Sequence, residues 1–235
     1  DPTLWLELAG LDVAVLAYTF STNGIPLPPG REDIVSMLDE ERMLDEIGAA
    51  KAEGADLVIV GCHWGFEYKH EPEPGTVKLG YALVEAGADI VLGGHSHYIQ
   101  PYEVVTTDDG REGFVIWSLG NFLSNMRKRH EDVGLVLELT LALEPGGGVA
   151  LADVGWAPTW VDATDANGHT RHRVVEILAE LPRCGHHPHL DAADCARMRQ
   201  ALDDTKKLLG EDDLILPPAP PDFTDTTGGE GAVSP

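Results

Sequence analysis

Two short apolar runs each lead into glycine and histidine: Leu-Val-Ile-Val-Gly-Cys-His at residues 57–63 and Ile-Val-Leu-Gly-Gly-His-Ser-His at residues 90–97. A third apolar run precedes them at residues 11–18. Runs that are apolar throughout are typical of strands buried on both faces of a parallel sheet. Apolar residues recur at helical spacing between these runs, at 43–50 and 77–86. The first half of the chain is therefore predicted to be an α/β fold with parallel strand–helix–strand units.

Beyond residue 100 the apolar pattern changes to that of antiparallel strands. The runs 102–105 and 114–119 flank an Asp-Asp-Gly turn, which predicts a β-hairpin. Leucine then alternates with other residues over 135–141, and a turn leads into the run 149–161. Strict alternation indicates a sheet with one buried and one solvated face.

The C-terminal third is predicted to be helical and then disordered. Apolar spacing favours helices near residues 173–181 and 191–209, and residues beyond 216 are mostly Pro, Asp, Thr and Gly. We expect a main domain at residues 1–162, a helical extension at 163–216 and a disordered tail at 217–235.

The composition excludes several classes of protein. The 235 residues include 16 Lys and Arg against 40 Asp and Glu, which gives a net charge of −24, and 43% are hydrophobic. This apolar content is that of a globular protein, and the acidic charge argues against binding nucleic acid or anionic lipid by charge. No apolar run in the printed sequence approaches the ~18 residues of a membrane span, and no leader-like segment is visible.

The three cysteines permit two interpretations. Cys62 follows an apolar run and is expected to be a buried thiol, whereas Cys184 and Cys195 lie eleven residues apart in a polar segment. If these two pair, the protein belongs to an oxidising compartment. As two free thiols they carry no such information.

A second histidine group and one basic run have simpler expected roles. His186, His187 and His189 lie between the two C-terminal cysteines, but their spacing matches no tetrahedral zinc pattern, which favours a surface loop. The basic run 127–129 permits two interpretations. It would attract an anionic substrate if it lies beside a binding site, and otherwise it is a solvated turn.

Three histidines are candidate metal ligands. His63 follows the second predicted strand, and His95 and His97 follow the third. Ligands bind beyond the carboxyl ends of parallel strands, and neighbouring strand ends lie about 5–10 Å apart. The three imidazoles can therefore converge on zinc or another divalent transition metal, with positions open for water or substrate. The alternative is hydrogen-bonded surface histidines, but the flanking glycines and the shared sheet edge favour the metal site.

A set of motifs covers about residues 11–143 in a fixed order. They are Ala17-Tyr18-Thr19 with Thr22-Asn23-Gly24, His63-Trp64-Gly65-Phe66-Glu67-Tyr68, the stretch from Ala86 to His97 with Gln100-Pro101, and Trp117-Ser118-Leu119-Gly120-Asn121-Phe122. Together they resemble the poly-gamma-glutamate capsule biosynthesis (CapA-type) family, a branch of the calcineurin-like metallophosphoesterase superfamily. The resemblance implies a four-layered α/β/β/α sandwich with two divalent metal ions (Zn, Mn or Fe), and His63, His95 and His97 as ligands.

The chain also departs from the family pattern. The family begins with a strand that ends in Gly-Asp, followed by loops that bring Asn, Glu and an Asn-Asn-His element, and none of these precedes Leu11. The chain therefore resembles the C-terminal half to two-thirds of such a protein. A two-metal phosphoesterase needs a carboxylate that bridges the ions and usually an acid for the leaving group. The resemblance places both outside this chain, so we expect one weakly held ion and little catalysis here.

Glu67 and Asn121 are the candidate catalytic residues. Glu67 is expected to orient a ligand or to act as general acid/base, and the alternative is a solvated carboxylate paired with Lys69. Asn121 either donates to substrate and holds the histidine loops or caps a turn. Trp64 and Trp117 are expected to pack beneath the site.

The family setting implies a role in making or exporting an anionic extracellular polymer. The expected chemistry is attack of metal-activated water on a phosphoester, and the expected partners are a phosphoester substrate or anionic polymer and a capsule-synthesis membrane complex. The alternatives are a non-catalytic accessory that binds a polyanion through its metals, and an inactive truncated fragment. The resemblance further implies a location at the cell surface, anchored to the membrane in the complete protein.

Overall fold

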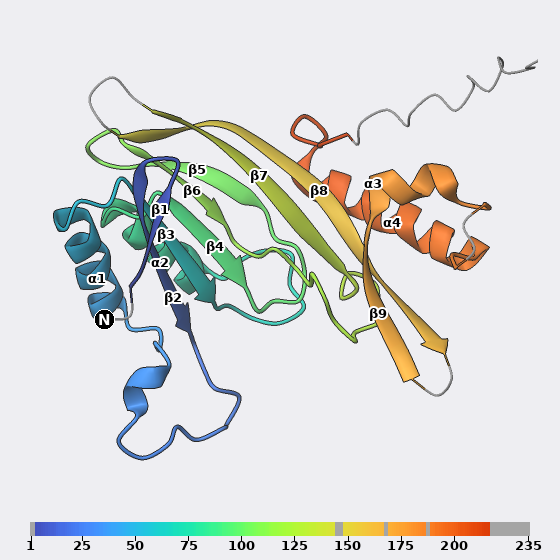
Figure 1. Ribbon diagram of the computed structural model, residues 1–235, viewed down its shortest axis with the longest axis horizontal. Helices are drawn as coiled ribbons and strands as arrows, with labels where there is room; N and C mark the ends of the chain where they lie inside the picture. Colours follow the sequence, from blue (N-terminus) through green and yellow to red (C-terminus); the bar gives the residue numbers. More distant parts are fainter. Residues whose placement is uncertain (1–2, 144–147, 167–168, 187–188, 217–235) are drawn as a thin grey trace, which may run out of the picture.

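The structure is a computed structural model that describes residues 3–143, 148–166, 169–186 and 189–216. Two sheets lie face to face, with helices on both outer sides (Figure 1). The elements are, in chain order, β1 (Leu4–Leu8), β2 (Leu11–Thr19), η1 (Glu32–Ile34), α1 (Glu40–Ala52), β3 (Leu57–His63), α2 (Pro74–Glu85), β4 (Ile90–Gly94), β5 (Tyr102–Thr106), β6 (Glu112–Ile116), β7 (Val133–Leu143), β8 (Val149–Ala166), β9 (His169–Glu176), α3 (Ile177–Glu180), η2 (Leu181–Arg183) and α4 (Ala192–Leu209).

The first sheet has six strands in the order β1-β2-β3-β4-β6-β5. β2, β3, β4 and β6 run parallel, and β1 and β5 pair antiparallel with their neighbours at the two edges. Helices α1 and α2 cover one face, where Met43 and Leu83 are fully buried in one cluster with Val58 and Val60. The parallel α/β prediction for the first half is confirmed.

The second sheet, β7-β8-β9, is antiparallel throughout. Its Leu135 and Trp156 share a buried cluster with Phe114 and Ile116 of the first sheet and with Met198 of α4. Helices α3 and α4 lie on the far side of this sheet, next to β8 (Figure 1). The layers therefore follow the order helix, sheet, sheet, helix, which confirms the expected four-layered sandwich.

The helix predicted at residues 173–181 is wrong over its first half. Residues up to Glu176 belong to β9, and α3 covers only Ile177–Glu180. Arg173 is paired in register with Asp162 of β8, and an ion pair of 3.1 Å joins the two side chains. The 3.6-residue spacing that suggested a helix was overridden by this cross-strand pairing, which a local pattern does not contain. Strand β1, whose five residues are all exposed, was not predicted.

The C-terminal part packs against β8 through α3 and α4 and contains a disulfide. Cys184 and Cys195 are bonded, so of the two interpretations of these cysteines the structure shows pairing. Cys62 is a free, buried thiol, as predicted.

The expected division into domains stays a prediction, because β8 continues past residue 162 without a break. The predicted tail at 217–235 lies outside the described residues. In the described ranges no helix is long and apolar enough to span a membrane.

Candidate metal centre at the ends of β3 and β4

The carboxyl ends of β3 and β4 bring two of the predicted ligands together. His63 is paired in register with Gly94, and the backbone N–H of Trp64 donates to the carbonyl of Gly94 at 3.0 Å. The ring centroids of His63 and His95 are 4.6 Å apart, and those of His95 and His97 are 6.1 Å apart. The three rings therefore lie at the same sheet edge.

The backbone that carries His95 and His97 is strained. Their φ angles are +102° and +60°, in the region that residues with a Cβ rarely adopt. Such conformations cost on the order of 1 kcal/mol or more each and cluster at functional sites. A loop that turns sharply twice within three residues is what places both rings close to His63.

A close-packed floor lies beneath the histidines. Trp64 and Trp117 are 3% and 2% exposed, and the indole Nε1–H of Trp64 donates to the carbonyl of Trp117 at 3.1 Å. A Cβ at Gly93 would lie 2.0 Å from that same carbonyl oxygen, so only glycine fits at this point of β4. The two tryptophans pack beneath the site, as predicted.

Asn121 holds the ring of His97. Nδ1 of His97 lies 3.0 Å from Oδ1 of Asn121, while Nδ2 of Asn121 donates to the carbonyl of Glu131 at 2.7 Å. Because Nδ2 is the donor toward Glu131, Oδ1 is the acceptor toward His97, and Nδ1 of His97 carries the proton. The lone pair on Nε2 of His97 then remains open for an ion, which is the usual arrangement at metal-binding histidines. The sequence predicts that Asn121 either donates to substrate and holds the histidine loops or caps a turn. Its contact with His97 is the one expected of a residue that holds a histidine loop.

Glu67 stands beside the same ring. Its Oε1 lies 3.8 Å from Nε2 of His97, and the ring of Tyr68 stacks on His97 with centroids 5.7 Å apart. Among the residues that the structure describes, no ion pair joins Glu67 to Lys69. The carboxylate is therefore within reach of an ion or a water molecule at Nε2 of His97.

Electrostatics favour neutral imidazoles. Partial burial, with His97 nearby, holds the pKa of His63 below its usual range. Partial burial and the neighbouring His63 lower the pKa of His95 in the same way. A metal ligand must be the neutral imidazole, so both rings are in the binding form near pH 7.

An open cleft of about 790 Å³ adjoins the histidines, and Glu67, Tyr68, His95 and Asn23 line it. Phe20, which follows β2, also lines the cleft. Its ring stacks on His63 with centroids 5.9 Å apart and lies tilted against His95 with centroids 4.4 Å apart. Sequence reasoning missed Phe20, although its position one residue beyond a buried strand could have indicated it. A substrate that enters this cleft would reach His95 directly.

The donor set suits a divalent transition metal, but the three rings do not form a finished site. Three imidazoles and a nearby carboxylate are the ligands that zinc prefers in proteins. In the described part of the chain, however, no group of three or more His, Cys, Asp or Glu side chains is already placed to hold an ion. His63, His95 and His97 would hold it only with some movement of their side chains.

The other candidate groups are the second histidine group and the basic run. His186 is exposed, and His187 falls outside the described residues. Within the basic run, Arg129 pairs with Asp204 at 2.6 Å, and Lys128 is 85% exposed.

Comparison with known proteins identifies the family. The sequence matches the family described as bacterial capsule synthesis protein PGA_cap over residues 1–126, more than half of the chain. The chain belongs to the PGA_cap family. The match includes β3, β4 and the three histidines, and it ends shortly after Asn121.

Two relatives of this PGA_cap chain come from Bacillus. The capsule biosynthesis protein CapA of Bacillus anthracis is 34% identical over 123 residues, which is 51% of this chain and 29% of the relative. The PGA biosynthesis protein CapA of Bacillus subtilis is 36% identical over 119 residues, 50% of this chain and 29% of the relative. The chain thus spans under a third of the length of either protein.

Among solved structures, the NAD nucleotidase NadN of Haemophilus influenzae is similar to this PGA_cap chain. The two share 14% sequence identity with a TM-score of 0.45, over 92% of this chain and 34% of the nucleotidase. A likeness at this level carries no inference about the function of the chain.

Proposed function

We propose that this chain binds a divalent transition metal through His63, His95 and His97 and contributes that site to a CapA-type metallophosphoesterase. The observation that carries the proposal is the 4.6 Å approach of the His63 and His95 rings at one sheet edge, with His97 fixed by Asn121. Strand-end imidazoles with one ring nitrogen anchored and the other open are typical of metal sites.

The complete protein would hold two ions, Zn, Mn or Fe, with further ligands from outside these histidines. Bound ions would activate water and neutralise charge that develops on a phosphoester. On this chain, Glu67 would receive or return a proton at the open side of His97, 3.8 Å away. Asn121 would keep the proton on Nδ1 of His97, so that Nε2 stays available.

A second candidate is a metal-dependent accessory that binds a polyanion without cleaving it. It is favoured by the names of the relatives, which are a capsule and a PGA biosynthesis protein. The net charge of −24 would repel a carboxylate polymer, so bound cations would have to supply the local attraction. The expected partners are the anionic polymer and the membrane complex that makes capsule.

The proposed location is the cell surface, with a membrane anchor in the complete protein. The disulfide between Cys184 and Cys195 supports an oxidising compartment.

Metal content and turnover test the proposal together. Zinc and manganese are measured by elemental analysis on the chain purified without chelator, with His63→Ala and His97→Ala as variants and exposed His186→Ala as the control. Turnover is followed with bis-p-nitrophenyl phosphate, and binding with polyglutamate retained on metal-loaded protein. Loss of metal in the first two variants alone supports the site. Turnover that disappears in His95→Ala supports the enzyme, whereas retention of polyglutamate without turnover supports the accessory. Equal metal content in all variants contradicts both.

A further inference from the structure

Helix α4 is tied to the 129–132 segment, which precedes β7. Nε and Nη2 of Arg129 donate to the two carboxylate oxygens of Asp204 at 2.9 and 2.6 Å. Nδ1 of His130 lies 3.7 Å from the same carboxylate. Two parallel hydrogen bonds between a guanidinium and a carboxylate fix orientation as well as distance.

A second pair reinforces the contact from the other end of the segment. Asp132, 4% exposed, binds the guanidinium of Arg197 through both oxygens and also accepts a hydrogen bond from Nε1 of Trp160 at 2.8 Å. Removing one partner of a buried ion pair leaves an uncompensated charge, so this contact resists separation.

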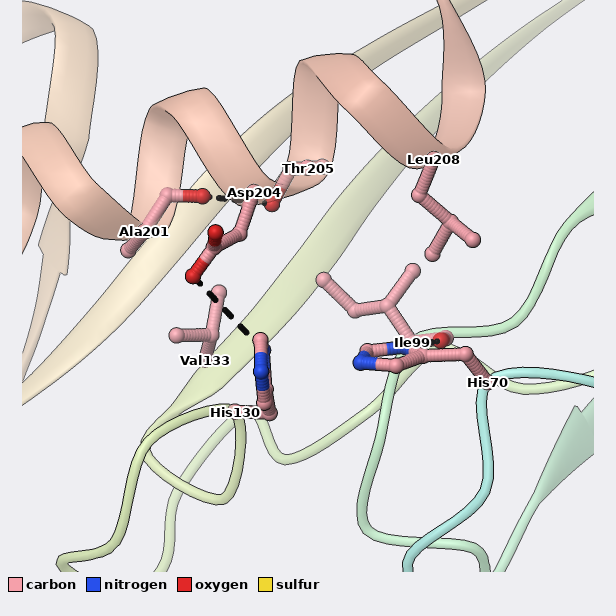
Figure 2. A pocket seen from close by; sticks show the side chains of 8 residues that line it. All are labelled: His70, Ile99, His130, Val133, Ala201, Asp204, Thr205 and Leu208. Atoms are coloured by element: carbon pink, nitrogen blue, oxygen red, sulfur yellow. Dashed lines mark hydrogen bonds and ion pairs between the residues drawn. The ribbon is translucent and has the colours of Figure 1, made fainter.

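The space between α4 and the loops is filled. Figure 2 shows Ala201, Thr205 and Leu208 of α4 facing His70 and His130 across a cavity of about 10 Å³. This volume has room for about one water molecule. A movement of α4 would therefore be passed to the segment rather than absorbed by a void.

The 129–132 segment in turn holds Asn121. The carbonyl of Glu131 accepts a hydrogen bond from Nδ2 of Asn121, and the backbone N–H of Asn121 donates to Val133 at 2.9 Å. Oδ1 of Asn121 is the acceptor for His97. A continuous run of contacts thus leads from α4 to the ring of a proposed metal ligand.

We infer that α4 positions His97 through the 129–132 segment and Asn121, with Asp204 and Arg129 as positioning residues. The inference deepens the proposed metal function and rests on it. α4 lies outside residues 1–126 that match the family, so the C-terminal part of this chain supplies a control element for the family's histidine site. Displacement of α4 would loosen Asn121 and let the proton of His97 move to Nε2, which weakens metal binding at that nitrogen.

Two variants that remove the charge of one partner test the inference, each with a neighbour as control. Asp204→Asn is compared with Asp203→Asn, which changes an exposed residue of the same helix. Arg129→Gln is compared with Arg127→Gln on the same loop. Metal-free protein is examined first, by ¹H–¹⁵N spectra of the imidazole nitrogens and hydrogen exchange over residues 121–133. The dissociation constant for Zn²⁺ is then measured against a chromophoric chelator.

We expect both test variants, and neither control, to mix the tautomers of His97 and to speed exchange over 121–133. Zinc affinity should fall roughly 2- to 30-fold, the range of coupling through intermediate residues. Spectra, exchange and affinity equal to the controls would overturn the inference. If wild-type protein binds no zinc, or His97→Ala leaves binding unchanged, the proposed function fails instead. The metal-free spectra still decide whether α4 positions His97.

Discussion

Nδ1 of His97 lies 3.0 Å from Oδ1 of Asn121, although the two residues are 24 positions apart in the sequence. The contact joins the loop after β4 to the loop before β7, and it leaves Nε2 of His97 as the free nitrogen. Asn121, which fixes the tautomer of the candidate ligand His97, therefore comes from a different loop than His97 itself.

Replacing Asn121 by Ala should weaken zinc binding about 10- to 100-fold, because the partner that selects the His97 tautomer is lost. The dissociation constant for Zn²⁺ checks this, with Asn125→Ala as the control. Asn125 contacts His172 at an exposed site. Equal affinities in the two variants would show that Asn121 does not orient a ligand.

Gly93→Ala should destabilise the protein by about 1–3 kcal/mol, because the new Cβ would press on the carbonyl of Trp117. Gly94→Ala is the matched control on the same strand, since nothing lies within 4 Å of its Cβ position. Its effect should stay within about 0.5 kcal/mol. Urea unfolding of both variants measures the difference, and similar midpoints would contradict the packing argument.

The stability of the protein should fall as the pH drops below about 6.5, and His130 should contribute to that fall. Burial and the neighbouring His70 hold the pKa of His130 below its ordinary value of 6.5. The unfolded chain therefore takes up the proton first, so the contribution is complete above pH 6.5 and is lost as the pH falls through the folded-state pKa.

His130→Asn should flatten the pH dependence of the unfolding free energy between about pH 5 and 7. Asparagine tolerates the positive φ of +75° at this position, which limits strain in the variant. Exposed His186→Asn is the control. A slope that is the same in both variants and in the wild type would exclude His130 as the source.

Removing the disulfide with Cys184→Ala and Cys195→Ala should cost about 2–4 kcal/mol, because the bond constrains the unfolded chain. Alkylation of the unfolded wild-type protein, followed by mass measurement, should label Cys62 alone without reductant and three cysteines with it. Three labels without reductant would mean that the bond does not form.

The tertiary structure corrected the expectations where partners distant in the sequence compete with local pattern. Residues 173–176 have spacing compatible with a helix, but pairing with β8 makes them a strand. β1 shows no burial pattern at all, since every residue in it is exposed, and only its pairing with β2 defines it.

The sequence by itself determined the parallel strands and the edge on which His63, His95 and His97 lie. Buried parallel strands can be recognised in the sequence as short apolar runs, and the carboxyl ends of such strands lie at the same edge of the sheet. Only the tertiary structure decided that Asn121 binds His97 and that Cys184 pairs with Cys195. It also decided that α4 forms an ion pair with the 129–132 segment. The contacts of Asn121 and of α4 join residues far apart in the sequence, and the sequence alone left the pairing of the two cysteines open, so only the folded chain selects them.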